Sequence, residues 1–146
     1  MGYCVSTKEV NFVIPNEKLD EAYKAVCDLN QHNHLKRGGV WPRNEKDGPH
    51  ENIWFSWMPW DYPEVFKDLE EVLNALGFET EYTDGDDLSL CYYDSKAGQE
   101  QLFLETIAPF VEEGSFIEWV GEDNAMWRDI VKDGKLVRQT PNITWE

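Results

Sequence analysis

The sequence has few basic residues and no long hydrophobic run. Lys and Arg together number 13 against 29 Asp and Glu, which gives a formal net charge of −16. A field of that sign repels phosphate backbones and attracts basic protein surfaces, so we expect no direct binding of DNA or RNA. No stretch approaches the about 18 apolar residues of a membrane-spanning helix. No hydrophobic segment follows residues 1–8 as it would in a signal peptide, so we also expect neither membrane insertion nor secretion.

Cysteine is scarce, and its spacing is uninformative for disulfides or metals. Cys4, Cys27 and Cys91 form no CxxC pair, and an odd number of thiols cannot close a disulfide set. Reduced thiols in a cytoplasm fit best. His32 and His34 lie in one loop but lack the paired spacing of a zinc site. Nucleophile-elbow, phosphate-loop and HExxH motifs are also missing, so we expect no enzymatic activity, no metal and no cofactor.

The rest of the composition is that of a folded domain. Apolar residues make up 41% of the chain and aromatic residues 14%, including seven Trp. Such values exclude intrinsic disorder. A length of 146 residues without a low-complexity segment or linker predicts a single domain over 1–146.

Hydrophobic periodicity and turn residues predict a mixture of strands and helices. The predicted strands are 9–14, 52–58, 78–82, 88–93, 116–120, 126–131 and 136–139, and the predicted helices are 17–30, 61–76 and a third between Ser95 and Gly114. Gly77 is placed to end the second helix, and Pro109 to end or kink the third. The order of elements predicts an α+β fold: a two-layer sandwich, ferredoxin-like or related, with a mostly antiparallel sheet and about three helices on one face.

The excess negative charge is concentrated in the second half of the chain. Residues 61–146 hold 21 acidic and 6 basic side chains, whereas residues 1–60 are nearly balanced. One interpretation is a contiguous anionic face that mimics the phosphate ladder of DNA and binds a basic protein. The alternative is that these charges are solvated and keep a Trp-rich domain soluble. The candidate partner-binding residues are Glu112, Glu113, Glu118, Glu122, Asp123, Asp84, Asp86 and Asp87.

A second candidate site combines tryptophans with a basic loop. The run from Trp54 to Trp60 contains three Trp and one Phe, and residues 36–46 hold four basic side chains. These aromatics fit either the core of a small domain or a pocket that stacks a planar ligand. In the ligand interpretation a nucleotide-like anion binds to Trp41, Trp54, Trp57, Trp60, Lys36, Arg37 and Arg43.

Several segments resemble those of a set of small accessory proteins of phages, prophages and bacteria. The clearest is 108–123, which reads APFVEEGSFIEWVGED, followed by Trp and Arg at 127–128. Segments 12–15, 28–30, 36–39 and 54–57 are similar to theirs as well. The resemblance implies a phage or mobile-element protein that acts on host machinery. It implies no particular activity and no functional residue.

The leading hypothesis is therefore a non-enzymatic acidic accessory protein, phage-encoded and cytoplasmic in a bacterial host. It would bind and inhibit a basic, nucleic-acid-binding host protein such as a defence nuclease. The alternative hypothesis is a domain that binds or sequesters a nucleotide-like anion. The sequence leaves the identity of the partner or ligand and the oligomeric state open.

Overall fold

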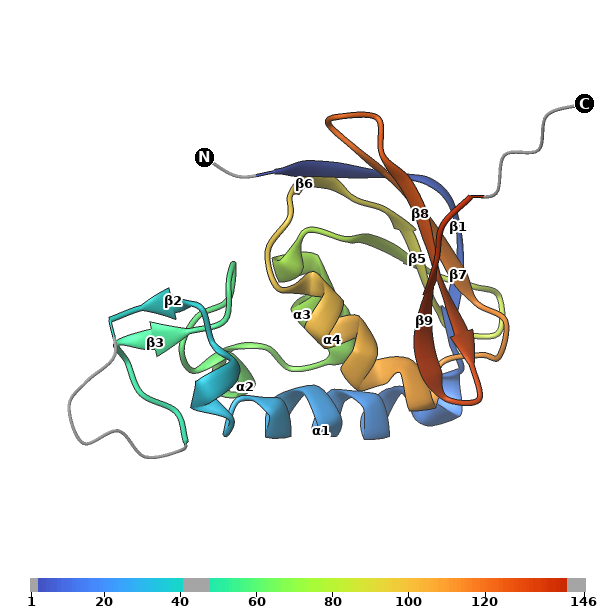
Figure 1. Cartoon of the computed structure of the whole chain (residues 1–146). Coiled ribbons are helices and arrows are strands. Elements are labelled where there is room, and N and C mark those ends of the chain that lie inside the picture. Colours follow the sequence, from blue (N-terminus) through green and yellow to red (C-terminus); the bar gives the residue numbers. More distant parts are fainter. Residues whose placement is uncertain (1–2, 41–47, 142–146) are drawn as a thin grey trace, which may run out of the picture.

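The computed structural model describes residues 3–40 and 48–141, which form helices packed on a curved sheet (Figure 1). The strands are β1 (Cys4–Ile14), β2 (Gly38–Gly39), β3 (Ile53–Trp54), β4 (Glu79–Tyr82), β5 (Leu88–Tyr92), β6 (Asp94–Lys96), β7 (Phe116–Gly121), β8 (Met126–Lys132) and β9 (Lys135–Gln139). The α-helices are α1 (Leu19–Leu29), α2 (Tyr62–Val65), α3 (Leu69–Leu76) and α4 (Glu100–Ile107). Three 3₁₀ turns, Asn16–Lys18, Asn33–Leu35 and Ala108–Phe110, adjoin α1 and α4.

The main sheet has the strand order β4-β5-β1-β7-β8-β9, and every pairing in it is antiparallel. β6 pairs with the first residues of β1, and β5 pairs with the last. Helices connect β1 to β4 and β5 to β7, and the four strands lie in the order β4-β5-β1-β7. This is the split β-α-β arrangement of ferredoxin-like folds, extended by β8 and β9. The sequence-based prediction of an antiparallel α+β fold is confirmed.

The core lies between one face of the sheet and the helices α1, α3 and α4, which Figure 1 shows on the same side of it. Alternate residues of β1, such as Phe12 and Ile14, are fully buried there. Each helix contributes an apolar stripe, represented by Val26, Leu73 and Phe103. Burying one such side chain contributes about 1.5–3 kcal/mol, so this shared core holds the sheet and the helices together.

The predicted second helix, 61–76, is divided in two. Phe66 adopts an extended backbone and ends α2, and Asp68 then caps α3 by accepting a hydrogen bond from Glu71 N at 3.0 Å. The Glu71 carboxylate accepts in turn from Lys67 N, which completes a capping arrangement around the start of α3. Gly77 ends α3 with a φ of 119°, as predicted.

Two other predicted elements differ in the structure. Only Ile53–Trp54 of the predicted strand 52–58 is a strand, because the chain turns at Trp57, whose φ is 73°. The third helix begins at Glu100 and not near Ser95, since residues 94–96 pair with the start of β1. Pro109 lies in the 3₁₀ turn that ends this helix, as expected.

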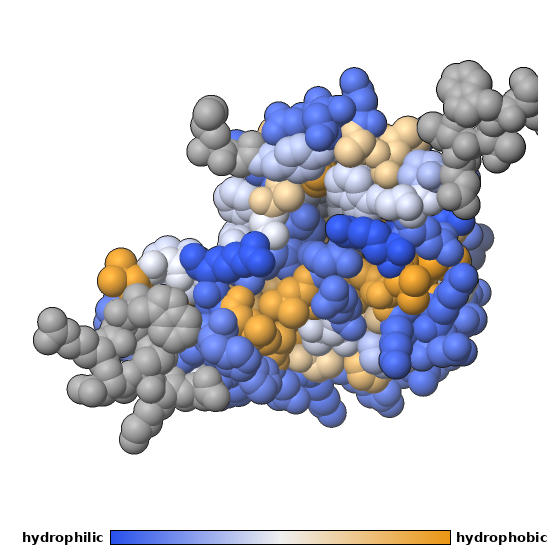
Figure 2. Space-filling model, in the orientation of Figure 1, coloured by the Kyte–Doolittle hydropathy of each residue, from blue (hydrophilic) through white to orange (hydrophobic). Residues whose placement is uncertain are grey.

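The face of the molecule in Figure 2 is largely hydrophilic, with hydrophobic side chains in separate areas. Among the residues that the structure describes, no helix is both long enough and apolar enough to cross a membrane.

Candidate functional site

Two of the predicted acidic residues lie at the beginning of β1. Glu122 and Asp123 occupy the turn between β7 and β8. Cys4 N donates to Glu122 Oε1 at 3.2 Å, and the Tyr3 hydroxyl donates to Asp123. The hydrogen bond from Tyr3 lowers the pKa of Asp123 below its usual range. Both carboxylates thus help to hold the first residues of β1 against the β7–β8 turn.

Glu112 and Glu113 lie at the opposite end of β1. Glu112 N donates to Val13 O at 2.9 Å. The 11 residues of β1 separate Glu112 and Glu113 from the β7–β8 turn. Glu118 lies between the two ends and forms an ion pair with Arg128 at 3.9 Å. Glu112 and Asp123 thus lie at opposite ends of β1, and a contiguous anionic face that includes both remains a prediction.

The densest negative charge lies elsewhere, on α2, α3 and the β4–β5 hairpin. Residues 61–94 contain eleven acidic side chains and one basic side chain, Lys67. None of the eleven is buried. We call this surface the acidic edge; its carboxylates are Asp61, Glu64, Asp68, Glu70, Glu71, Glu79, Glu81, Asp84, Asp86, Asp87 and Asp94. It includes the predicted turn residues Asp84, Asp86 and Asp87.

Within the acidic edge, α3 is tied to β4. The Thr80 hydroxyl on β4 contacts Glu70 Oε2 and Asn74 Oδ1 on α3, each at 3.1 Å. β4 is the outermost strand of the main sheet, so this surface forms one side of the molecule. Two large aromatic side chains are exposed within it: Tyr82 is 48% accessible and Tyr92 is 41% accessible.

The pKa values of three groups on the β4–β5 hairpin are raised, in part by the carboxylates of the acidic edge. Partial burial, then the charge of Glu81, raises the pKa of the Cys91 thiol. Burial, followed by the charges of Glu70 and Asp68, raises the pKa of Tyr82. The pKa of Tyr92 is raised mainly by its hydrogen bond to Asp94. Burial and then the neighbouring carboxylates favour the neutral forms of Cys91 and Tyr82, and the hydrogen bond to Asp94 favours the neutral form of Tyr92.

The tryptophans of the second predicted site are at the surface and not in the core. Trp54, Trp57 and Trp60 are 37%, 48% and 37% exposed, whereas their neighbours Phe55 and Met58 are buried. The interpretation of these three Trp as core residues is wrong, because the turn at Trp57 directs the smaller apolar side chains inward. Trp41 and Arg43 lie outside the described residues.

The basic residues of that site serve different roles. Lys36 is only 3% exposed; its Nζ donates to Asn33 Oδ1 at 2.8 Å and lies 5.6 Å from the centre of the Phe55 ring. Its charge is therefore directed into the protein. Arg37 is exposed and borders a different hollow, next to Gln99 and Glu105. The structure does not bring Lys36 and Arg37 to one anion-binding surface.

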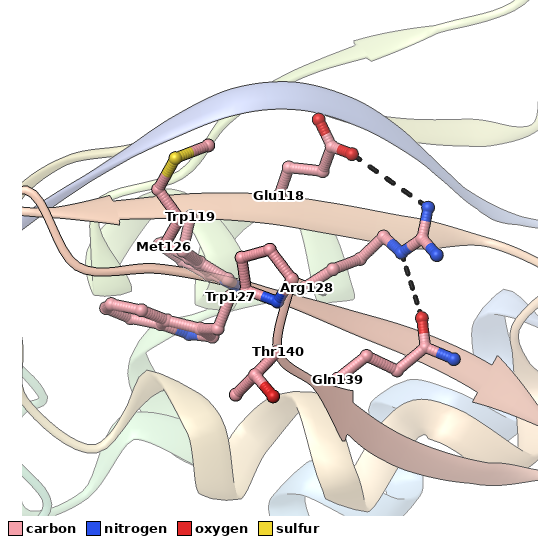
Figure 3. Close-up of a pocket in the computed structure, with 8 residues that line it drawn as sticks. Glu118, Trp119, Met126, Trp127, Arg128, Gln139 and Thr140 are labelled. Carbon is pink, nitrogen blue, oxygen red and sulfur yellow. Dashed lines mark hydrogen bonds and ion pairs between the residues drawn. The ribbon is translucent and has the colours of Figure 1, made fainter. Parts of the chain in front are cut away.

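A pair of tryptophans that the sequence analysis did not select borders a pocket beside the end of β9. Trp119 on β7 and Trp127 on β8 line it, as do Met126 and Thr140 (Figure 3). Arg128 points away from the two indoles, toward Glu118 and Gln139. Strand alternation alone would have placed both Trp on one sheet face. No signal in the sequence shows that space remains beside them.

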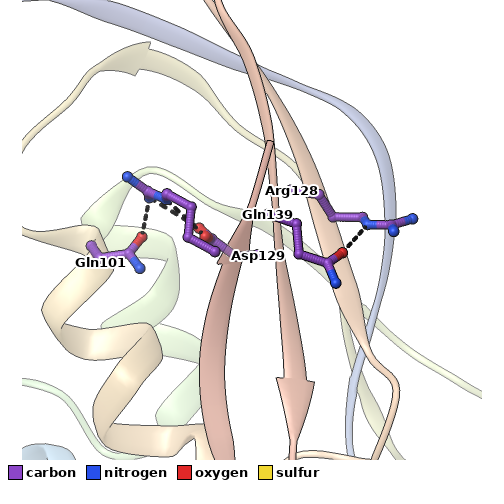
Figure 4. Close-up of polar contacts among 5 residues, drawn as sticks. Gln101, Arg128, Asp129 and Gln139 are labelled. Atoms are coloured by element: carbon purple, nitrogen blue, oxygen red, sulfur yellow. Dashed lines mark hydrogen bonds and ion pairs between the residues drawn. The ribbon is translucent and has the colours of Figure 1, made fainter. Parts of the chain in front are cut away.

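An ion pair between β8 and β9 lies next to Trp127. Asp129 is fully buried on β8 and accepts two hydrogen bonds from Arg138, which also donates to Gln101 on α4 (Figure 4). The bond to Asp129 raises the pKa of Arg138 further above its usual value. The guanidinium carbon lies 5.3 Å from the centre of the Trp127 ring. These contacts attach β8 and β9 to the helix layer.

Among residues 3–40 and 48–141, no group of three or more His, Cys, Asp and Glu side chains is arranged to hold a metal ion. The chain matches no protein-family model, no curated protein and no solved structure.

Proposed function

We propose that this protein is a non-enzymatic binding protein whose acidic edge associates with a basic, nucleic-acid-binding protein of a bacterial host, such as a defence nuclease. The observation that carries the proposal is the density of charge at that edge, where eleven accessible or half-accessible carboxylates face a single lysine. Such a surface presents closely spaced negative charges as the backbone of DNA does, and it would occupy the groove that the partner uses for nucleic acid.

The carboxylates of the acidic edge are not used in ion pairs within the described part of the chain. Both ion pairs found there, Arg128–Glu118 and Arg138–Asp129, lie on β7, β8 and β9. Uncompensated charges of one sign repel one another and reduce the stability of the folded state. A cationic partner relieves that repulsion, which supports binding over a purely solubilising role.

The acidic edge also has features of a protein interface beyond its charge. The exposed rings of Tyr82 and Tyr92 lie among the carboxylates, and tyrosine is enriched in interfaces. The charges would accelerate association and make it sensitive to salt, while the two rings would supply apolar area that is buried on contact. The opposite side of the sheet, at β9, offers a more balanced set of charges, with Lys132, Lys135 and Arg138.

The test compares two variants that remove four charges each. The edge variant carries Glu79→Gln, Glu81→Gln, Asp84→Asn and Asp86→Asn; the control variant carries Glu112→Gln, Glu113→Gln, Glu122→Gln and Asp123→Asn. Both have a net charge of about −12, so a difference between them reports position and not total charge. A partner captured from bacterial lysate on wild-type protein is purified and titrated against all three proteins at several salt concentrations.

We expect the edge variant to bind at least ten-fold more weakly than wild type and the control variant to bind within about two-fold. Duplex DNA should compete with the wild-type protein for the partner. Equal loss in both variants would show that only total charge matters, and no loss in the edge variant would refute the proposed surface. Circular dichroism and thermal unfolding of each variant establish that it is folded.

A further inference from the structure

The two tryptophans Trp119 and Trp127 form a wall shared by two hollows. They are directly opposite each other on β7 and β8, with ring centres 6.5 Å apart and ring planes inclined by 16°. One hollow, of about 250 Å³, opens beside the end of β9, where Thr140 and Pro141 follow the last strand residue (Figure 3). The second, of about 300 Å³, extends toward Glu100 and Gln101 at the beginning of α4. The second volume is at the lower limit of the usual range for ligand pockets and the first is slightly below it, so the occupant must be small.

Both indoles have an unused hydrogen-bond donor. The Nε1 atoms of Trp119 and Trp127 are buried, and neither has an acceptor among the described residues. Trp119 as a whole is only 2% exposed. A buried indole N–H normally finds a partner, because leaving it unpaired costs about 1–3 kcal/mol. Two such donors on one pair of rings, both on residues that line the hollows, indicate that an entering molecule supplies the acceptors.

The charges around the hollows disfavour an anionic occupant. Arg138 borders the second hollow, but its charge is matched by the buried carboxylate of Asp129. Glu100, which is 7% exposed, adds a further carboxylate to the same wall. A phosphate or carboxylate in the second hollow would therefore meet net negative charge and be repelled. An uncharged ligand avoids that cost.

We propose that the hollows beside Trp119 and Trp127 bind an uncharged, planar heterocycle with carbonyl acceptors, of the size and chemistry of a nucleobase. Such a ring would lie edge-on to the two indoles, and its carbonyl oxygens would accept from the two Nε1 donors after a small rotation of the indoles. The amides of Gln101 and Gln139 lie on the two sides of the pair and complement the polar edge of a heterocycle. This site is separate from the acidic edge and does not depend on the proposed function.

The experiment observes the indole N–H groups directly. In a ¹⁵N–¹H correlation spectrum each Trp gives its own Nε1–H signal, and the variants Trp119→Phe and Trp127→Phe assign the two signals of interest. Wild-type protein is titrated with uracil and with thymine, which both carry carbonyl oxygens, and separately with orthophosphate and with glucose. We expect uracil or thymine to move both signals downfield in a saturable manner, and phosphate and glucose to leave them unchanged.

Variants then locate the site. Trp127→Phe keeps a ring but removes the donor, and we expect it to weaken binding of the active base at least ten-fold. Trp54→Phe, on the exposed β3 strand, should leave the affinity unchanged. The proposal is overturned if neither base moves the two signals at millimolar concentration. It is also overturned if the two N–H groups are hydrogen-bonded only to bound water, or if glucose or phosphate binds instead. The titration of wild-type protein decides this even if a variant fails to fold.

Discussion

Arg138 on β9 donates from Nε to Asp129 Oδ1 on β8 at 2.9 Å, although Asp129 is fully buried and the Arg138 side chain is half exposed. The buried carboxylate depends on this single cation, because the described residues place no other ion-pair partner within reach. Gln101 on α4 completes the contact by accepting from Arg138 at 2.8 Å. The ion pair therefore connects the last two strands to each other and to the helix layer.

Removing Arg138 should destabilise the protein more than removing both charges of the pair. We expect Arg138→Met to lower the free energy of unfolding by about 2–3 kcal/mol, less than for a fully buried pair because the guanidinium is half exposed. The double variant Arg138→Met with Asp129→Asn should recover part of that loss, since no uncompensated carboxylate remains. A double-mutant cycle by urea denaturation measures the coupling. Strictly additive losses would contradict this prediction.

The long segment between α1 and α2 is held by Gln99, at the start of α4. Gln99 Oε1 accepts from Arg37 N at 3.1 Å and from Ser56 N at 3.0 Å, and its Nε2 donates to Leu35 O at 2.6 Å. We expect Gln99→Leu to lower the free energy of unfolding by about 1–3 kcal/mol, because three backbone groups lose their partner.

Hydrogen exchange localises the effect of Gln99→Leu. Exchange should accelerate around Leu35 to Arg37 and around Ser56, and stay unchanged in β7 and β8. The matched control is Gln139→Leu, which removes a surface contact to Arg128 and should cost less than about 0.5 kcal/mol. Uniform acceleration across the sheet would show that Gln99 supports the whole fold and not this segment.

Much of the fold could be predicted from local patterns. A few neighbouring residues encode each of three features that the structure confirms. They are the hairpin at Asp84 to Asp87, the three C-terminal strands and the end of α3 at Gly77. The composition of the segment from Trp54 to Trp60 is typical of a buried strand, but the strand ends at Trp54. Its backbone conformation depends on distant contacts such as Gln99, which no local pattern reveals.

The candidate sites were harder to predict for a related reason. Charge counting located the acidic excess in the second half of the chain, but it gave equal weight to Glu112 and Glu81. Only the pairing of strands shows that carboxylates on α3 and β4 are neighbours while Glu112 and Asp123 lie at opposite ends of β1. The stacking of Trp119 and Trp127 likewise depends on the register of β7 and β8.

Gly77 should tolerate no side chain, whereas Gly85 should tolerate one. Gly77 has a φ of 119°, and a Cβ there would lie 2.8 Å from the ring of Tyr93, which is fully buried. We expect Gly77→Ala to cost about 1–2 kcal/mol, from backbone strain and displacement of that ring. Gly85 has open space around it, and Gly85→Ala should change stability by less than about 0.5 kcal/mol. Thermal and urea unfolding of the two variants measure this, and equal costs would contradict it.

The reactivity of Cys91 offers a direct measure of the field at the acidic edge. Its pKa is raised by partial burial and then by the carboxylates of Glu81 and Glu79, so the thiol stays protonated at pH values where an ordinary cysteine begins to ionise. Because only the thiolate reacts, alkylation by the neutral reagent iodoacetamide should be slow at pH 8 although Cys91 is exposed. Its rate should rise through a midpoint at higher pH than that of an unperturbed thiol.

Removing one of the carboxylates near Cys91 should lower the pH midpoint of its alkylation rate. We expect Glu81→Gln to accelerate alkylation of Cys91 at pH 8 by about two- to three-fold, because the thiolate no longer faces that charge. Glu113→Gln, at the far side of β1, should have no effect, and added salt should reduce the difference between wild type and Glu81→Gln by screening the field. Peptide-level mass spectrometry follows Cys91 separately from Cys4 and Cys27. If both variants react at the wild-type rate, burial alone sets the pKa of Cys91, and the acidic edge exerts a weaker field than its position on β4 and β5 implies.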